Sequence, residues 1–133
     1  MNRTSSAAAI GLLVALAAGT AGAGDPLPAI EQSARAAGKF TGFSAERGAA
    51  FYRAKGTDWS CATCHTPDPR KPGRHTVTGK AIEPMAPAVN ARRLTDEAKV
   101  EKWFKRNCKD VLGRECTALE KGDVITYLRS LGR

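Results

Sequence analysis

Histidine is scarce in this chain of 133 residues, which contains only His65 and His75 beside four cysteines. These residues do not form a second ligand pair at zinc spacing, so the composition argues against a structural zinc site. After the first 23 residues the chain also lacks an apolar run long enough to cross a bilayer, a strand pattern of even moderate strength and an internal repeat. These absences favour an all-α fold.

One short motif predicts a cofactor for that fold. Cys61-Ala62-Thr63-Cys64-His65 is a C-x-x-C-H sequence, the attachment signature of c-type haem. Cys61 and Cys64 can form thioethers to the two vinyl groups of one porphyrin, and His65 would supply the proximal imidazole to the iron. A thioredoxin-like dithiol is the alternative, but the βαβ pattern that it needs around the motif is missing. The motif therefore predicts one covalently attached haem c, with its iron.

Residues 1–23 have the pattern of a secretory signal peptide. Arg3 precedes an apolar, small-residue stretch over residues 7–19, and Ala21-Gly22-Ala23 is an A-x-A cleavage site. The stretch is shorter than the ~20 residues of a transmembrane helix, although a retained membrane anchor stays open as the alternative. Cleavage would leave about 110 residues, which suits one domain. Because c-type haem is attached outside the cytoplasm, the pattern predicts a periplasmic protein.

The cysteines outside the haem motif are Cys108 and Cys116. The periplasm permits disulfides, so we expect these two residues to be bridged. A loop of this size would stabilise the fold by about 2–3 kcal/mol on the chain-entropy model. The alternative is Cys108 as a thiolate ligand to iron, although the nearby thiol of Cys116 would compete for it.

The chain is basic, with a formal net charge of +8. Such a charge predicts an acidic redox partner, because it steers the encounter and sets the association rate more than the affinity. Nucleic acid is the weaker interpretation, since the lysines and arginines are scattered and the protein is exported. For any single charge, a solvated surface is the commonest explanation.

The exported part divides into a leader and a helical domain. Residues 24–43 are rich in alanine, glycine and proline and are expected to be loose, with a short helix near residues 30–37. Residues 44–133 are expected to form the cytochrome c domain. Ser44 is a plausible cap for a helix that ends near Ala54. Five prolines then make residues 67–90 a long loop of the kind that lines a site.

Two further helices are predicted after this loop. Thr95 is expected to cap a helix whose apolar face includes Val100, Trp103 and Phe104. Thr117 and Glu120 form a T-x-x-E capping box that opens the last helix. The apolar face of that last helix consists of Val124, Tyr127, Leu128 and Leu131.

The sixth ligand of the iron separates an electron carrier from a gas-binding protein. The candidates are Met85, Asn107, His75 and a lysine. Met85 lies in a proline-bracketed loop like those that present methionine in electron-transfer cytochromes. Asn107 lies on the apolar face of the predicted helix, where its two interpretations, a helix C-cap and an iron ligand, have similar support from spacing. An amide oxygen suits ferric iron better than ferrous iron, so reduction would open such a site.

The sequence from Val100 to Thr117, VEKWFKRNCKDVLGRECT, closely resembles the sphaeroides haem protein (SHP) family of monohaem class I c-type cytochromes. Its W-x-x-R-N-C motif, with a second cysteine eight residues on, is specific. Residues 78–80 and Ile82, with the P-x-A-P sequence over residues 84–87, also match. The resemblance extends from about Arg47 to the end of the chain.

The resemblance implies a class I cytochrome c fold in which Cys61 and Cys64 hold the haem and His65 is the proximal ligand. It further implies that Asn107 is a distal ligand lost on reduction, beside a disulfide between Cys108 and Cys116. Members of the family bind oxygen and nitric oxide when reduced. They exchange electrons with a dihaem cytochrome c and a membrane b-type cytochrome, which are therefore the implied partners.

Met85 is a departure, because the family member compared has leucine there. Its expected role is packing against the distal haem face. If it instead bound the iron stably, the protein would be a simple electron carrier. His75 is expected to be a surface residue, and Arg74 and Lys80 are either partners of the haem propionates or solvated. We predict no catalytic residue, since a reductase or peroxidase would need a distal proton donor and only His75 is a candidate.

Overall fold

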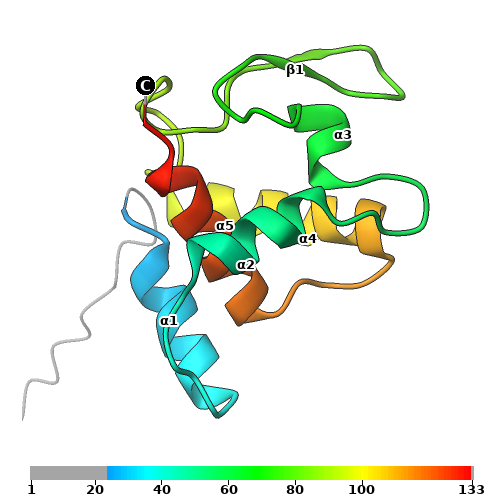
Figure 1. Ribbon diagram of the computed structural model, residues 1–133. Helices are drawn as coiled ribbons and strands as arrows, with labels where there is room; N and C mark the ends of the chain where they lie inside the picture. Colours follow the sequence, from blue (N-terminus) through cyan, green and yellow to red (C-terminus); the bar gives the residue numbers. More distant parts are fainter. Residues whose placement is uncertain (1–23, 133) are drawn as a thin grey trace, which may run out of the picture.

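The computed structural model describes residues 24–132 and shows a helical fold, as the sequence predicts (Figure 1). The predicted signal peptide, residues 1–23, lies outside the described residues. The described elements are α1 (Leu27–Ala36), α2 (Ala45–Arg53), α3 (Cys61–His65), β1 (Gly73–Arg74), β2 (Ala81–Ile82), α4 (Glu97–Leu112) and α5 (Ala118–Ser130). No helix among the described residues is long and apolar enough to cross a membrane.

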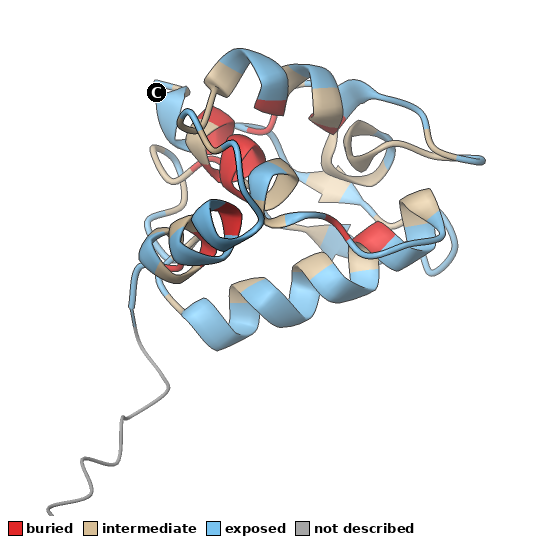
Figure 2. Cartoon of the chain, turned by 90° about the horizontal axis from the view of Figure 1, so that it is seen from below, coloured by how far each residue is buried: buried red, intermediate tan, exposed pale blue. Residues whose placement is uncertain are grey.

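The core forms where α1, α2 and α5 meet, and most of the buried residues gather there (Figure 2). Tyr52 of α2 packs against Val124, Tyr127 and Leu128 of α5, all of them buried. The two helices approach so closely because position 48 is glycine. A Cβ atom on Gly48 would lie 2.0 Å from the carbonyl oxygen of Asp123. The backbones of α2 and α5 therefore lie in direct contact at this crossing.

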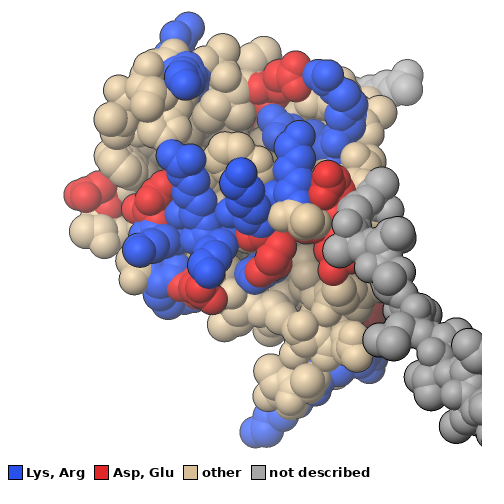
Figure 3. Space-filling view, turned by 180° about the vertical axis from the view of Figure 1, so that it is seen from behind, with Lys and Arg blue, Asp and Glu red and all other residues tan. Residues whose placement is uncertain are grey.

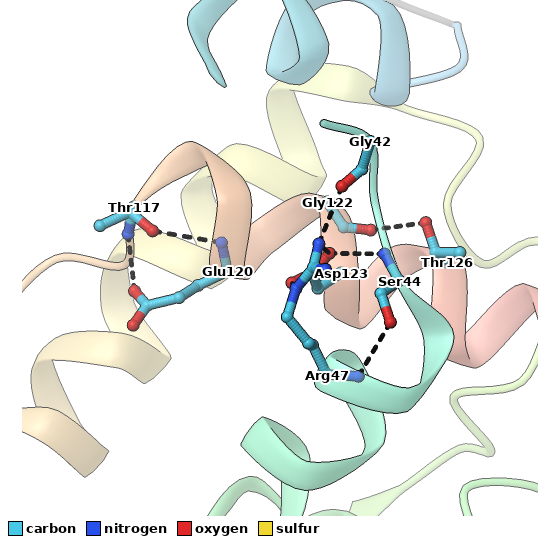
Figure 4. A network of polar contacts seen from close by, with 8 residues as sticks. All are labelled: Gly42, Ser44, Arg47, Thr117, Glu120, Gly122, Asp123 and Thr126. Carbon is cyan, nitrogen blue, oxygen red and sulfur yellow. Dashed lines mark hydrogen bonds and ion pairs between the residues drawn. The ribbon is translucent and has the colours of Figure 1, made fainter. Parts of the chain in front are cut away.

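A buried carboxylate reinforces this crossing (Figure 4). Asp123, which is 4% exposed, accepts hydrogen bonds from the backbone N–H of Ser44 (2.7 Å) and from the Arg47 guanidinium (2.7 and 2.8 Å). The Ser44 hydroxyl in turn accepts from the N–H of Arg47, so Ser44 caps α2 as predicted. The network joins the start of α2 to the middle of α5.

The capping box of Thr117 and Glu120 is present at the start of α5 (Figure 4). The cap of α4 differs from the prediction. Asp96 rather than Thr95 is its N-cap, because the Asp96 carboxylate accepts from the N–H of Lys99 while the Thr95 hydroxyl donates to the carbonyl of Arg92. Aspartate and threonine are both good N-cap residues, so the sequence alone does not show which of the adjacent Thr95 and Asp96 begins the helix.

Two other segments differ from the sequence-based expectation. Within the leader that we expected to be loose, α1 packs against α5 and buries Ile30 and Ala34. An ion pair between Asp25 and Arg129 (2.7 Å) holds the start of this segment. Within the predicted long loop, β1 and β2 pair in an antiparallel hairpin, with Gly73 opposite Ile82. Strands of two residues are too short to give a periodic pattern in the sequence.

Replacing Gly48 by alanine should destabilise the protein by about 2–3 kcal/mol, because the added methyl group would overlap the backbone of Asp123. This loss exceeds the ~1 kcal/mol that alanine offers as a better helix former. Chemical unfolding measures the change. Gly132→Ala is the matched control, since nothing lies within 4 Å of that position, and equal stabilities of the two variants would contradict the prediction.

Candidate haem-binding site

The C-x-x-C-H motif forms α3, a helix of five residues. Ser60 precedes it, and its backbone N–H donates to the Thr63 hydroxyl (2.9 Å), which fixes where the helix begins. The helical turn brings Cys61 and Cys64, three residues apart, to one side. Both thiols are free and half-buried, and burial raises the pKa of Cys61 to about 11.

His65 follows as the last residue of α3 and is half-buried. Burial, with smaller contributions from Arg93 and His75, lowers the pKa of His65 to about 4. The imidazole is therefore neutral at pH 7, which is the form that binds a metal. Its Nδ1 atom is the one buried side-chain nitrogen or oxygen among the described residues that lacks a hydrogen-bond partner.

Backbone contacts fix the position of this motif. A Cβ atom on Gly73 would lie 2.1 Å from the carbonyl oxygen of Cys64, so β1 can pack on α3 only because residue 73 is glycine. On the other side, the buried Tyr52 hydroxyl donates to the carbonyls of His65 (2.9 Å) and Thr66 (2.8 Å) in a three-centre hydrogen bond. Burial raises the pKa of Tyr52, so the hydroxyl keeps the proton that it donates.

Thr66, directly after the motif, has a strained backbone with φ 62° and ψ 156°. This conformation is almost restricted to glycine and costs about 1–3 kcal/mol. The Tyr52 hydroxyl holds the Thr66 carbonyl, and the Thr66 hydroxyl donates to the carbonyl of Asp68. These two hydrogen bonds hold the strained residue directly after His65.

Cys61 and Ala62 of the motif pack against the core cluster, and half-buried apolar residues of other segments extend the same cluster. They include Met85, Leu94, Phe104 and Leu131. Val100, Phe104, Asn107 and Val111 of α4 recur at helical spacing and are also half-buried. Among the described elements, α4 makes only slight contact with the other helices and strands. We call this face of α4, formed by Val100, Phe104, Asn107 and Val111, the apolar cradle. A flat apolar group held by α3 would be its packing partner, so the residues fit haem.

Asn107 lies inside α4 rather than at its end, so the interpretation of Asn107 as a helix C-cap is wrong. Gly113 is the C-cap, in the left-handed conformation with φ 70°. The neighbouring Cys108 forms a disulfide with Cys116, with a Cα–Cα distance of 5.6 Å, and this bond ties the last turn of α4 to the start of α5. Cys108 is thus held in that bond and is not a candidate iron ligand.

The structure places the other candidate ligands on the loop between α3 and α4. The Met85 side chain packs against the core cluster, and its backbone N–H donates to the Pro69 carbonyl (2.8 Å). His75 lies in the hairpin turn, where its Nδ1 accepts from the backbone N–H groups of Val77 and Thr78. Arg74 donates to the Gly79 carbonyl (2.6 Å) and closes the same turn, and Lys80 is exposed.

Sequence reasoning missed Arg93. Its guanidinium is half-buried near His65 and donates to the carbonyls of Pro84 (2.9 Å) and Glu83 (2.8 Å), and burial lowers its pKa. It also missed the role of Tyr52, which was visible only as an apolar residue on a helix face. Neither residue belongs to a local motif, because each bonds backbone carbonyls of another segment, about ten residues away or more.

A helical chain with C-x-x-C-H on a short helix, a neutral half-buried histidine and an apolar cradle defines a monohaem c-type cytochrome. The comparisons agree with this class. Residues 38–128 match the family model described as a domain of unknown function (DUF1924). The chain is 43% identical to the cytochrome c-type protein SHP of Cereibacter sphaeroides over 122 residues, which cover 88% of this chain and 94% of that protein. We conclude that the chain belongs to the SHP family and carries one covalently bound haem c.

Cytochrome c'' of Methylophilus methylotrophus is a second relative, 46% identical over 78 residues, or 59% of this chain and 54% of that protein. Two solved structures have similar folds. Oxidized cytochrome c'' superposes with a TM-score of 0.73 at 36% identity, over 80% of this chain and 92% of that one. Oxidized SHP, described as an oxygen-binding cytochrome c, superposes with a TM-score of 0.71 at 41% identity, over 81% of this chain and 98% of that one.

Single replacement of Cys61 or Cys64 by alanine should leave one thioether to the haem. The α-band of the pyridine haemochrome would then shift to longer wavelength, because one vinyl group stays conjugated with the ring. Absorption spectroscopy and the mass of the intact protein measure the change. The control is the double variant Cys108→Ser, Cys116→Ser, which removes the disulfide and should keep the two-thioether spectrum; a shift in this control would contradict the assignment.

Tyr52→Phe should lower the free energy of unfolding by about 1–3 kcal/mol, since it removes the donor to two inward-facing carbonyls. It should also change the electron paramagnetic resonance spectrum of the ferric protein, because the backbone of His65 is no longer held. Tyr127→Phe is the control, as among residues 24–132 the Tyr127 hydroxyl hydrogen-bonds only the Arg53 guanidinium (3.0 Å) and not the haem motif. An unchanged spectrum in Tyr52→Phe would show that the hydroxyl does not position His65.

Proposed function

We propose that this chain is a periplasmic one-electron cytochrome whose distal iron ligand in the ferric state is Asn107. Reduction would release the Asn107 amide, so that the ferrous protein could bind oxygen or nitric oxide. When bound, haem iron supplies one-electron redox chemistry and an acceptor site for a diatomic gas. The description of the relative SHP as an oxygen-binding cytochrome c supports the gas-binding part of this proposal.

The observation that carries the proposal is the placement of Asn107 on the inner face of α4. Asn107 shares this face with Val100, Phe104 and Val111, and all four are half-buried. An amide oxygen is a hard donor, which matches ferric iron better than ferrous iron. Because the amide oxygen prefers ferric iron, reduction to ferrous iron would weaken the bond and make the ligand displaceable.

The disulfide beside Asn107 supports both the ligand and the compartment. It closes the chain from Cys108 to Cys116 and so limits how far the end of α4 can move when the amide leaves the iron. Disulfides persist in oxidising compartments such as the periplasm. Cell fractionation with N-terminal sequencing tests the location, and an intact N-terminus on a cytoplasmic protein would contradict it.

The alternative is a simple electron carrier with stable ligation by His65 and Met85. Met85 is the weaker ligand candidate, because its half-buried side chain already packs against the buried cluster where α2 and α5 cross. Moving the thioether to the iron would give up that packing.

We also propose an acidic redox partner for this basic protein. The resemblance to the SHP family points to a dihaem cytochrome c and a membrane b-type cytochrome as the chemical kinds of partner. Opposite charge on the two surfaces would accelerate the encounter, and the rate would fall as salt screens the charges.

Spectra of the holoprotein distinguish Asn107 from Met85 as ligand. Asn107→Ala should convert the ferric protein to a high-spin form with an open site, because alanine has no donor atom. Met85→Leu should leave the ferric spectrum almost unchanged and serves as the matched control. Absorption spectra of the ferric protein, and of the ferrous protein before and after carbon monoxide, measure both variants.

The opposite pattern would overturn the proposal. If Met85→Leu became high-spin while Asn107→Ala stayed low-spin and inert to carbon monoxide, then Met85 would be the ligand and the protein an electron carrier. A wild-type ferrous form that stays low-spin and does not bind carbon monoxide would likewise reject the displaceable ligand.

A further inference from the structure

The outer face of α4 carries a stripe of five exposed cations, which we call the α4 basic stripe. Its members are Lys99, Lys102, Lys105, Arg106 and Lys109. Blue side chains gather on the side of the molecule where α4 lies, seen from behind in Figure 3. The stripe lies on the side of the helix opposite to Phe104 and Val111, which face inward.

The stripe is poorly neutralised by the rest of the described chain. Lys105 lies 3.9 Å from Glu115, and both side chains are more than 70% exposed. The other four cations form no ion pair among residues 24–132. Like charges three or four residues apart on a helix repel each other, as in Lys102–Arg106 and Lys105–Lys109. Glu101 and Asp110, one turn from Lys105 and Arg106, offset part of this repulsion, but the five cations outnumber these two carboxylates.

An exposed aromatic residue borders the stripe. Trp103 is 44% exposed, and the Arg106 guanidinium lies over its ring, 5.7 Å from the ring centroid. Tryptophan and arginine are the residue types most enriched at the energetic centres of protein interfaces. Trp103 also directly precedes Phe104 of the apolar cradle, so the edge of the stripe adjoins the haem-facing side of the helix.

The hairpin region is the competing basic surface, and its cations are more engaged. Arg70 pairs with Asp68 (2.8 Å), and Arg74 donates to the Gly79 carbonyl. Lys71 and Lys80 stay exposed. The α4 basic stripe thus has more exposed cations without an ion pair than the hairpin region has, and they lie together on one face of a helix.

We propose that the α4 basic stripe, with Trp103 at its edge, is the docking surface for an acidic electron-transfer protein. Carboxylates on the partner would neutralise the stripe and relieve its internal repulsion. Because an α-helix is only about 10 Å in diameter, a partner seated there lies close to the face that carries Asn107. This inference rests on the proposed electron-transfer function and names the surface that serves it.

Stopped-flow reduction of the full ferric holoprotein by an acidic one-electron donor, reduced flavodoxin, tests the proposal. The stripe variant is Lys102→Gln, Lys105→Gln, Lys109→Gln. The control, Lys55→Gln, Lys71→Gln, Lys80→Gln, removes the same net charge from other exposed lysines. At low salt the second-order rate constant should fall about tenfold for the stripe variant and less than about threefold for the control. High salt should abolish the difference.

Equal losses in the two variants would overturn the proposal, since net charge alone would then account for the rate. A larger loss in the control would assign docking to the hairpin region. Binding of the holoprotein to phosphatidylglycerol vesicles tests whether the stripe instead contacts an acidic membrane surface. If the stripe variant loses vesicle binding while its reaction with flavodoxin is unchanged, the stripe is a membrane contact and the proposal fails.

Two readouts keep this test separate from the question of the iron ligand. The ferric and ferrous spectra of the stripe variant should match those of the wild type, because none of the three lysines belongs to the apolar cradle. Its thermal unfolding should occur at the same temperature or higher, as repulsion along α4 is removed. The rate comparison holds whether Asn107 or Met85 binds the iron.

Discussion

The contact on which the rest of the molecule depends is the close crossing of α2 and α5. Gly48 allows the two backbones to touch, and the buried Asp123 carboxylate fixes their registry through Ser44 and Arg47. A buried carboxylate with three charge-assisted or backbone donors specifies one arrangement, because a shift of either helix would leave it unpartnered. The crossing also places Tyr52 in the core, where its ring meets Tyr127 and its hydroxyl meets the backbone of the haem motif. The geometry of the proximal side is therefore set by a helix pair that does not itself contain the motif.

The two sides of the haem site are held in different ways. On the proximal side, α3 is fixed by the Tyr52 hydroxyl, by the strained turn at Thr66 and by the close approach of Gly73. On the side proposed to be distal, α4 makes only slight contact with other described elements, and its end is held by the disulfide and by the contact of Gly56 with the Val111 carbonyl. Rigid support of His65 keeps one ligand constant. Weaker support along α4 is what the proposed release of Asn107 would require.

Local sequence patterns predicted the parts of the structure that local chemistry determines. The helical class, the cap at Ser44 and the capping box of Thr117 and Glu120 each depend on residues within one turn of each other. The haem itself follows from the five residues of α3, and membership of the family confirms it. A short helix was predicted near α1, but its packing on α5, the hairpin and the roles of Tyr52 and Arg93 were not. The packing of α1 depends on a partner distant in sequence, the strands of the hairpin are too short for a pattern, and the contacts of Tyr52 and Arg93 span about ten residues or more.

The two faces of α4 bring these observations together. Its inner face, the apolar cradle, includes Phe104 and Asn107, and its outer face presents the basic stripe to solvent. In most surface helices, burial of the apolar face against other helices supplies the stability. Here α4 makes only slight contact with the other described elements, so its apolar face is left for the cofactor to cover. In the proposed function, the position of α4 would then depend on the state of the iron. A partner bound to the outer face would contact the same rigid element that carries the proposed ligand. Electron delivery and ligand release would then act on one helix, whose movement is limited at its end by the Cys108–Cys116 bond.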